Sequence, residues 1–177
     1  MSGFSNQQLV VTAIGEDRPG IVGALTQLVS DCNCNIIDSR IAILGNEFSF
    51  IMLLAGDMSA ISRIEHTLPT KSVELGLLTM MKRTSSHQSS EYSAGYTIEY
   101  SGVDAPGTLS RVTKLLAQYH LSISSLKSDT FDCEGALHMR SELEINLPFD
   151  VEFDEFKLKF ENLCNEFQLE HILRRIR

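Results

Sequence analysis

The pattern Gly-x-Asp-x-Pro-Gly occurs twice in the chain, first as Gly15-Glu16-Asp17-Arg18-Pro19-Gly20 and again as Gly102-Val103-Asp104-Ala105-Pro106-Gly107. The similarity extends beyond these six residues, because residues 9–40 align with residues 96–127. Further identities in that alignment are Thr26/Thr113, Leu28/Leu115 and Ile36/Ile123. An internal repeat that includes a turn and a matching apolar helix face indicates one structural unit present in two copies. The sequence therefore predicts two modules of the same fold.

Hydrophobic periodicity predicts the elements of the first copy. They are, in order, a strand at 9–14, a helix opened by Pro19-Gly20 with apolar residues from 21 to 32, strands at 36–44 and 47–55, a helix over 58–68, and a strand at 73–82. Gly45-Asn46 has the composition of a hairpin turn. Asp57 is expected to cap the second helix, which is expected to end before Pro69.

The second copy has the same order of elements, with one departure. Its predicted strands and helices are a strand at 96–100, a helix with apolar residues from 109 to 119, strands at 121–130 and 136–147, a helix capped by Asp150 and carrying apolar residues from 153 to 167, and a strand at 169–176. A longer acidic loop at 129–135, with Asp132, Cys133 and Glu134, is expected where the first copy has its short turn.

Each copy thus reads β-α-β-β-α-β, which with right-handed crossovers gives an antiparallel four-stranded sheet with both helices on one face. The predicted fold class is α+β, with two tandem ferredoxin-like modules. Residues 84–94 are polar and serine-rich, the composition of a tether between domains. The expected boundaries are 1–83 for the first module, 84–94 for the linker and 95–177 for the second module.

Charge and composition exclude several classes of protein. The chain of 177 residues has a formal net charge of −8, and only Arg174-Arg175-Ile176-Arg177 forms a basic run, so direct binding to nucleic acid is not expected. No apolar run reaches membrane-spanning length and no signal peptide is recognisable, which predicts a cytoplasmic protein without a membrane role. The four cysteines and five histidines form no metal-binding or catalytic motif, so no cofactor, metal or enzymatic activity is expected.

The first strand–helix turn has the chemistry of a small-ligand site. Free N–H groups and the positive dipole end at a helix N-terminus favour a carboxylate. Gly20 lets the backbone approach a ligand, Asp17 can accept from an ammonium group, and Asn35 can donate and accept. Three simpler roles stay open for these residues: Asp17 and Asp104 could only stabilise their turns, Asn35 could make a local turn, and Arg18 could be a solvated surface residue.

A β-α-β-β-α-β module of this size, with Asp17-Arg18-Pro19-Gly20-Ile21-Val22 at its first turn and Asn33-Cys34-Asn35-Ile36 entering the next strand, resembles an ACT domain. Two such modules over nearly the whole chain resemble the glycine cleavage system transcriptional repressor family. The resemblance implies an amino-acid effector, with glycine favoured, and action through a LysR-type activator protein rather than DNA. It also allows a homo-oligomer.

The resemblance implies ligand contacts at Asp17, Arg18, Gly20, Ile21 and Asn35 in the first module. In the second module the equivalent contacts are Asp104, Gly107 and Ser122, where Ala105 replaces Arg18 and Ser122 replaces Asn35, so that site is less complete.

Two functions are compatible with these features. The first is a non-enzymatic amino-acid sensor that controls a transcription factor by protein–protein contact. The alternative is a detached ACT regulatory subunit that binds and controls a metabolic enzyme.

Overall fold

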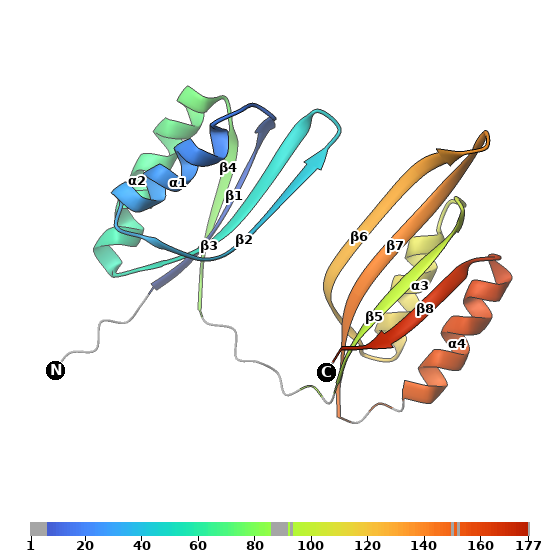
Figure 1. Ribbon diagram of the computed structural model, residues 1–177. Helices are drawn as coiled ribbons and strands as arrows, with labels where there is room; N and C mark the ends of the chain where they lie inside the picture. Colours follow the sequence, from blue (N-terminus) through green and yellow to red (C-terminus); the bar gives the residue numbers. More distant parts are fainter. Residues whose placement is uncertain (1–6, 86–91, 93, 150, 152, 177) are drawn as a thin grey trace. The chain divides into compact units, whose positions relative to one another are not determined.

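The computed structural model describes residues 7–85, 92, 94–149, 151 and 153–176. The chain divides into two compact units, Met1–Gln88 and Ser89–Arg177. Each unit is a four-stranded antiparallel sheet with two helices against one face (Figure 1). The predicted fold class, two tandem ferredoxin-like modules, is confirmed.

The first unit follows the predicted order of elements. Its strands and helices are β1 (Gln7–Glu16), α1 (Ile21–Asp31), β2 (Asn35–Leu44), β3 (Glu47–Gly56), α2 (Met58–Leu75) and β4 (Leu78–Thr84). The strand order across the sheet is β2-β3-β1-β4, which leaves β2 and β4 at the edges. Alternate residues of the central strands, such as Leu9, Val11 and Ala13 of β1, are fully buried under the helices.

The second unit repeats this topology. Its elements are β5 (Ala94–Val103), α3 (Thr108–Gln118), β6 (Ser122–Cys133), β7 (Ala136–Leu147), α4 (Phe153–Glu166) and β8 (Glu170–Arg175), with the strand order β6-β7-β5-β8. Its core is more aromatic than that of the first unit, with Tyr100, Phe156 and Phe160 fully buried. The core of each unit lies between its sheet and its two helices.

The expectation that the second helix ends before Pro69 is wrong. The α2 helix continues through Pro69 to Leu75 and ends at Gly76, which has φ 65° in the left-handed region. Burial explains the continuation, because Leu68 and Ser72 both face the core. These contacts offset the backbone hydrogen bond that proline removes. Consequently β4 begins at Leu78 rather than at Val73.

The expected acidic loop at 129–135 is also absent. The strands β6 and β7 pair as far as Cys133 and Ala136, and only Glu134 and Gly135 connect them. Both of these residues have positive φ, 53° and 83°, as tight hairpin turns require. The Asp132 side chain accepts a hydrogen bond from the Gly135 N–H at 3.2 Å. The acidic residues therefore extend a long hairpin instead of forming a loop.

Three further expectations concern single positions. Asp57 caps α2 as predicted, because its side chain accepts from the Ala60 N–H at 2.7 Å. Pro19 precedes α1 rather than lying in its first turn, and Gly20 is the N-cap. Asp150 and most of the expected linker lie outside the described residues, while Thr84 belongs to β4.

No helix within residues 7–85, 92, 94–149, 151 and 153–176 is both long and apolar enough to cross a membrane. No group of three or more His, Cys, Asp or Glu side chains within those residues is arranged to hold a metal ion.

Candidate functional site

The two repeated turns have the same backbone geometry. The Asp17 N–H donates to the Asn46 carbonyl at 3.3 Å, and the Asp104 N–H donates to the Leu137 carbonyl at 2.8 Å. Gly20 and Gly107 are the N-caps of α1 and α3, with φ of 89° and 92°. A residue with a Cβ is strained at such φ values. The glycines of the repeated pattern thus allow the chain to turn sharply into each helix.

Two of the predicted contact residues in the first unit have structural roles. The Arg18 guanidinium donates to the Leu75 carbonyl at the end of α2. Ile21 is 4% exposed and belongs to the core beneath α1. The Asp17 side chain and Gly20 are exposed beside them.

Within one unit, the structure does not bring Asn35 to the turn. Asn35 lies opposite Ala55 of β3, which in turn lies opposite Gln8 near the start of β1. Asp17 follows Glu16, at the other end of β1. Eight residues of strand separate the two ends, about 27 Å at the usual rise per residue. In the second unit Ser122 is likewise at the far end of the sheet from Asp104, opposite Asn146.

A cleft of about 540 Å³ opens at the turn of the second unit. It lies between the N-terminal part of α3 and the neighbouring strands β6 and β7. Its lining consists of the turn, the first residues of α3 and three inward-facing residues of the hairpin: Asp104, Ala105, Pro106, Gly107, Thr108, Leu109, Ser110, Thr113, Ser128, Thr130 and Met139.

The cleft is rich in polar groups that a small ligand could use. No side chain caps the N-terminus of α3. The N–H groups of Leu109 and Ser110 in its first turn are therefore available to a ligand. The hydroxyls of Ser110 and Thr130 make no hydrogen bond within the described part of the chain. The Asp104 carboxylate is exposed at the mouth. The cleft therefore presents hydrogen-bond donors and one carboxylate.

A row of polar side chains continues from the cleft into the core. The hydroxyls of Ser128 and Ser141 are 2.8 Å apart, and Ser141 is completely buried. Tyr100 lies directly opposite Ser141 across the sheet. Its hydroxyl is buried without a well-formed hydrogen bond to any described residue. Burial raises the pKa of Tyr100, although the nearby Ser141 hydroxyl acts in the opposite direction. The phenol is therefore neutral at physiological pH.

The first unit has apolar residues at the equivalent positions of its sheet. Strand register matches Ser128 and Thr130 with Ile41 and Ile43, which lie opposite Phe50 and Phe48. Ala13 stands where the second unit has Tyr100. The two turns are thus alike in backbone, but only the second adjoins a hydroxyl-lined wall. Sequence reasoning singled out Asp104 and Gly107 and missed Ser128, Thr130 and Ser141. The alternate polar residues at 128 and 130 were the available signal.

The C-terminal basic run is partly neutralised by the sheet. Arg174 pairs with Glu99 across β5 and β8, with 3.4 Å between the nitrogen and the oxygen. Arg177 lies outside the described residues.

The cysteines Cys32, Cys34, Cys133 and Cys164 are all free thiols. Burial raises the pKa of the Cys164 thiol to about 12, so this group remains protonated.

Comparison with known proteins gives consistent matches. The ACT domain family model matches residues 7–82. The glycine cleavage system transcriptional repressor of Escherichia coli is 41% identical over 164 residues, which cover 92% of this chain and 86% of that protein.

Two solved structures match the whole fold. One, provisionally assigned as a glycine cleavage system transcriptional repressor, has 34% identity and a TM-score of 0.75 over 98% of this chain and 99% of its own. The other, a protein of unknown function from Galdieria sulphuraria, has 26% identity and a TM-score of 0.79 over 98% and 100% of the two chains. The chain belongs to the family of the glycine cleavage system transcriptional repressors, regulatory proteins built from tandem ACT domains.

Proposed function

We propose that the protein is an amino-acid-responsive regulator of transcription whose effector, glycine or a similarly small amino acid, binds in the cleft of the second unit. The observation that carries this proposal is the hydroxyl-lined cleft of about 540 Å³ at the N-terminus of α3. Family membership supports the regulatory role.

The cleft offers separate partners for the two charges of a zwitterion. The effector carboxylate accepts from the N–H groups of Leu109 and Ser110, where the helix dipole also favours an anion. The Ser110 and Thr130 hydroxyls can add hydrogen bonds to the same group. Asp104 accepts from the ammonium group. Glycine has little apolar surface to bury, so we expect a dissociation constant of roughly micromolar to millimolar size.

The contrast between the units favours the second one as the effector module. In the first unit, Ile41 and Ile43 replace the hydroxyl-bearing Ser128 and Thr130. An isoleucine side chain offers no hydrogen bond to a carboxylate and would leave part of the ligand's charge desolvated without compensation. The first unit retains Asp17 and its free helix N-terminus, but Arg18 is engaged with Leu75.

The regulatory output is proposed to be protein–protein contact in the cytoplasm, with a LysR-type activator as the partner. The net charge of −8 supports contact with a protein rather than with DNA, because phosphate binding needs an excess of exposed cations. A non-enzymatic role is supported by the relatives, which are named as transcriptional repressors.

Isothermal titration calorimetry of the full-length chain with glycine tests the effector site. Asp104→Ala is expected to weaken binding by about 1–3 kcal/mol, because the ammonium loses its charged partner. Asp17→Ala is the matched control at the equivalent position of the first unit and is expected to leave affinity unchanged. Ser128→Ile, which copies the first unit, is expected to abolish the heat signal while circular dichroism stays native. The reverse ranking of Asp17→Ala and Asp104→Ala would contradict the proposal.

A further inference from the structure

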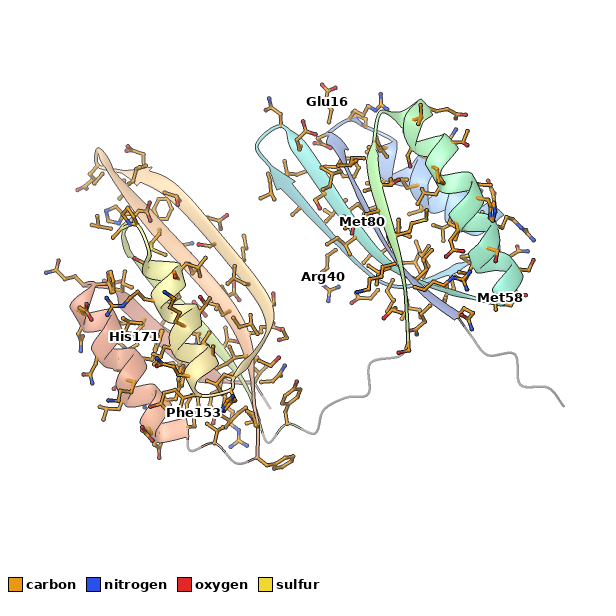
Figure 2. The ribbon with its side chains drawn as sticks, turned by 180° about the vertical axis from the view of Figure 1, so that it is seen from behind. Glu16, Arg40, Met58, Met80, Phe153 and His171 are labelled. Atoms are coloured by element: carbon orange, nitrogen blue, oxygen red, sulfur yellow. The ribbon has the colours of Figure 1, made fainter. Side chains whose placement is uncertain are left out.

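The sheet of the first unit has an apolar surface on the side away from its own helices, here called the open face. It is formed by outward-pointing residues of β1, β3 and β4: Val10, Thr12, Ile14, Ser49, Ile51, Leu53, Leu78 and Met80. Leu78 and Met80 are 73% and 70% exposed. Figure 2 shows Met80 on this side of the sheet, away from the helices. The register makes the patch continuous, since Thr12 lies between Ile51 and Met80.

The corresponding face of the second unit has the opposite character. Its outward-pointing residues on β5, β7 and β8 are largely charged: Glu99, Arg140, Glu142, Glu144, Glu170 and Arg174. A charged sheet face is well solvated, whereas a contiguous exposed apolar patch usually marks a contact surface. The two modules share one fold, so the difference is a property of these side chains and not of the architecture.

Unpaired charges lie at opposite ends of the open face. Glu16 and Glu47 are directly opposite each other on β1 and β3, and like charges in that position destabilise a sheet. Lys82 lies at the other end, opposite Val10. None of these three residues forms an ion pair within the described residues, whereas Arg40, at the border of the face in Figure 2, pairs with Asp38. Six residues of strand separate Val10 from Glu16, about 20 Å.

We propose that the open face docks onto the open face of a second copy of this chain. The charge pattern is self-complementary when the two-fold axis runs in the interface plane and perpendicular to the strands. In that arrangement Lys82 of each copy meets Glu16 and Glu47 of the other. The apolar side chains between the two ends then pack as two aligned sheets do. An axis parallel to the strands would instead bring the four carboxylates together.

Light scattering after size-exclusion chromatography of the full-length chain tests the surface. The wild-type chain is expected to be a dimer, and Met80→Asp is expected to weaken dimerisation at least tenfold by placing a charge in the apolar centre. Ile172→Asp is the matched control, since Ile172 is an exposed isoleucine on the charged sheet face of the second unit. It should leave the dimer intact. A monomeric wild-type chain, or a dimer that Met80→Asp leaves unchanged, would overturn the proposal.

Charge reversal tests the orientation. The double variant Glu16→Lys/Glu47→Lys and the single variant Lys82→Glu are each expected to weaken the dimer, because each brings like charges together. The triple variant that combines them restores opposite charges and is expected to recover the wild-type dissociation constant to within a few-fold. Circular dichroism spectra should be native throughout, because all three residues are exposed. A triple variant that is no tighter than the weaker parent would contradict the proposed two-fold.

Discussion

Gly20 shows how one residue fixes the entry of the chain into a helix. Its φ of 89° lies in the left-handed region, while an added Cβ would meet no other atom within 4 Å. Gly20→Ala is therefore expected to lower the free energy of unfolding by about 1–2 kcal/mol through backbone strain alone. Urea denaturation followed by circular dichroism measures this.

Gly23 provides the control for that substitution, because it lies inside α1 and also has free space around it. Gly23→Ala is expected to stabilise the protein by up to about 1 kcal/mol, since alanine is the better helix former. If the two alanine substitutions shifted stability in the same direction, the assigned backbone conformation at Gly20 would be incorrect.

Single residues were predictable from the sequence where their role is local. The turn residues Asp17 and Asp104 and the cap Asp57 depend only on the chain within a few positions, and each lies in the predicted element. Ser141 and Tyr100 could not be predicted in the same way. Along the chain a helix and a strand separate the two residues. They come together only through the register of β5 against β7.

At the scale of elements, an ion pair joins α2 to β4. Two of the three guanidinium nitrogens of Arg83, Nε and Nη2, donate to the Glu65 carboxylate at 2.8 and 2.7 Å. The hydrogen bond from Arg83 lowers the pKa of Glu65 below its usual range. The pair therefore contributes to stability above the ordinary carboxyl pKa, and this contribution is lost as the pH falls through the lowered value.

Thermal melts of Glu65→Gln against the wild-type chain check that link. The variant is expected to melt slightly below the wild type at pH 7, and the difference is expected to shrink in acid as Glu65 becomes protonated. Glu74→Gln serves as a comparison, since Glu74 pairs with Lys71 inside the same helix and joins no second element. A difference that grew as the pH fell would have the wrong sign for this interaction.

The order and type of the elements followed from hydrophobic periodicity, but some boundaries did not. Pro69 favours a helix end on local grounds, yet the burial of Leu68 and Ser72 extends the helix by about two further turns. The acidic stretch at 129–135 has a loop-like composition, but pairing of β6 with β7 continues to the final two-residue turn. In both cases long-range contacts outweigh the local preference.

For the whole molecule, the negative net charge predicts that the protein does not bind operator DNA directly. With a net charge of −8, the purified protein is expected to show no sequence-specific retardation of an operator fragment at physiological salt. An electrophoretic mobility shift experiment checks this, with the same fragment at low salt as a control for non-specific binding. Tight and sequence-dependent retardation by the protein alone would contradict action through a protein partner.

The repeat predicted two similar modules, but it did not predict how they differ. The backbone of the two turns is nearly the same, so the proposed difference in function is assigned to side chains that the repeat does not preserve. Ser128 and Thr130 give the second unit a polar wall, and Ile51 and Met80 give the first unit an apolar sheet face. We infer a division of roles, with effector binding in one module and self-association in the other.

The effector is proposed to occupy the second turn and not the first. Titration of the ¹⁵N-labelled full-length chain with glycine, followed by NMR of the backbone amides, tests it most directly. Saturable shifts of the Leu109 and Ser110 amides are expected at millimolar or lower glycine, with the equivalent Val22 and Gly23 amides unchanged. Shifts at Val22 and Gly23 without shifts at Leu109 and Ser110 would contradict it.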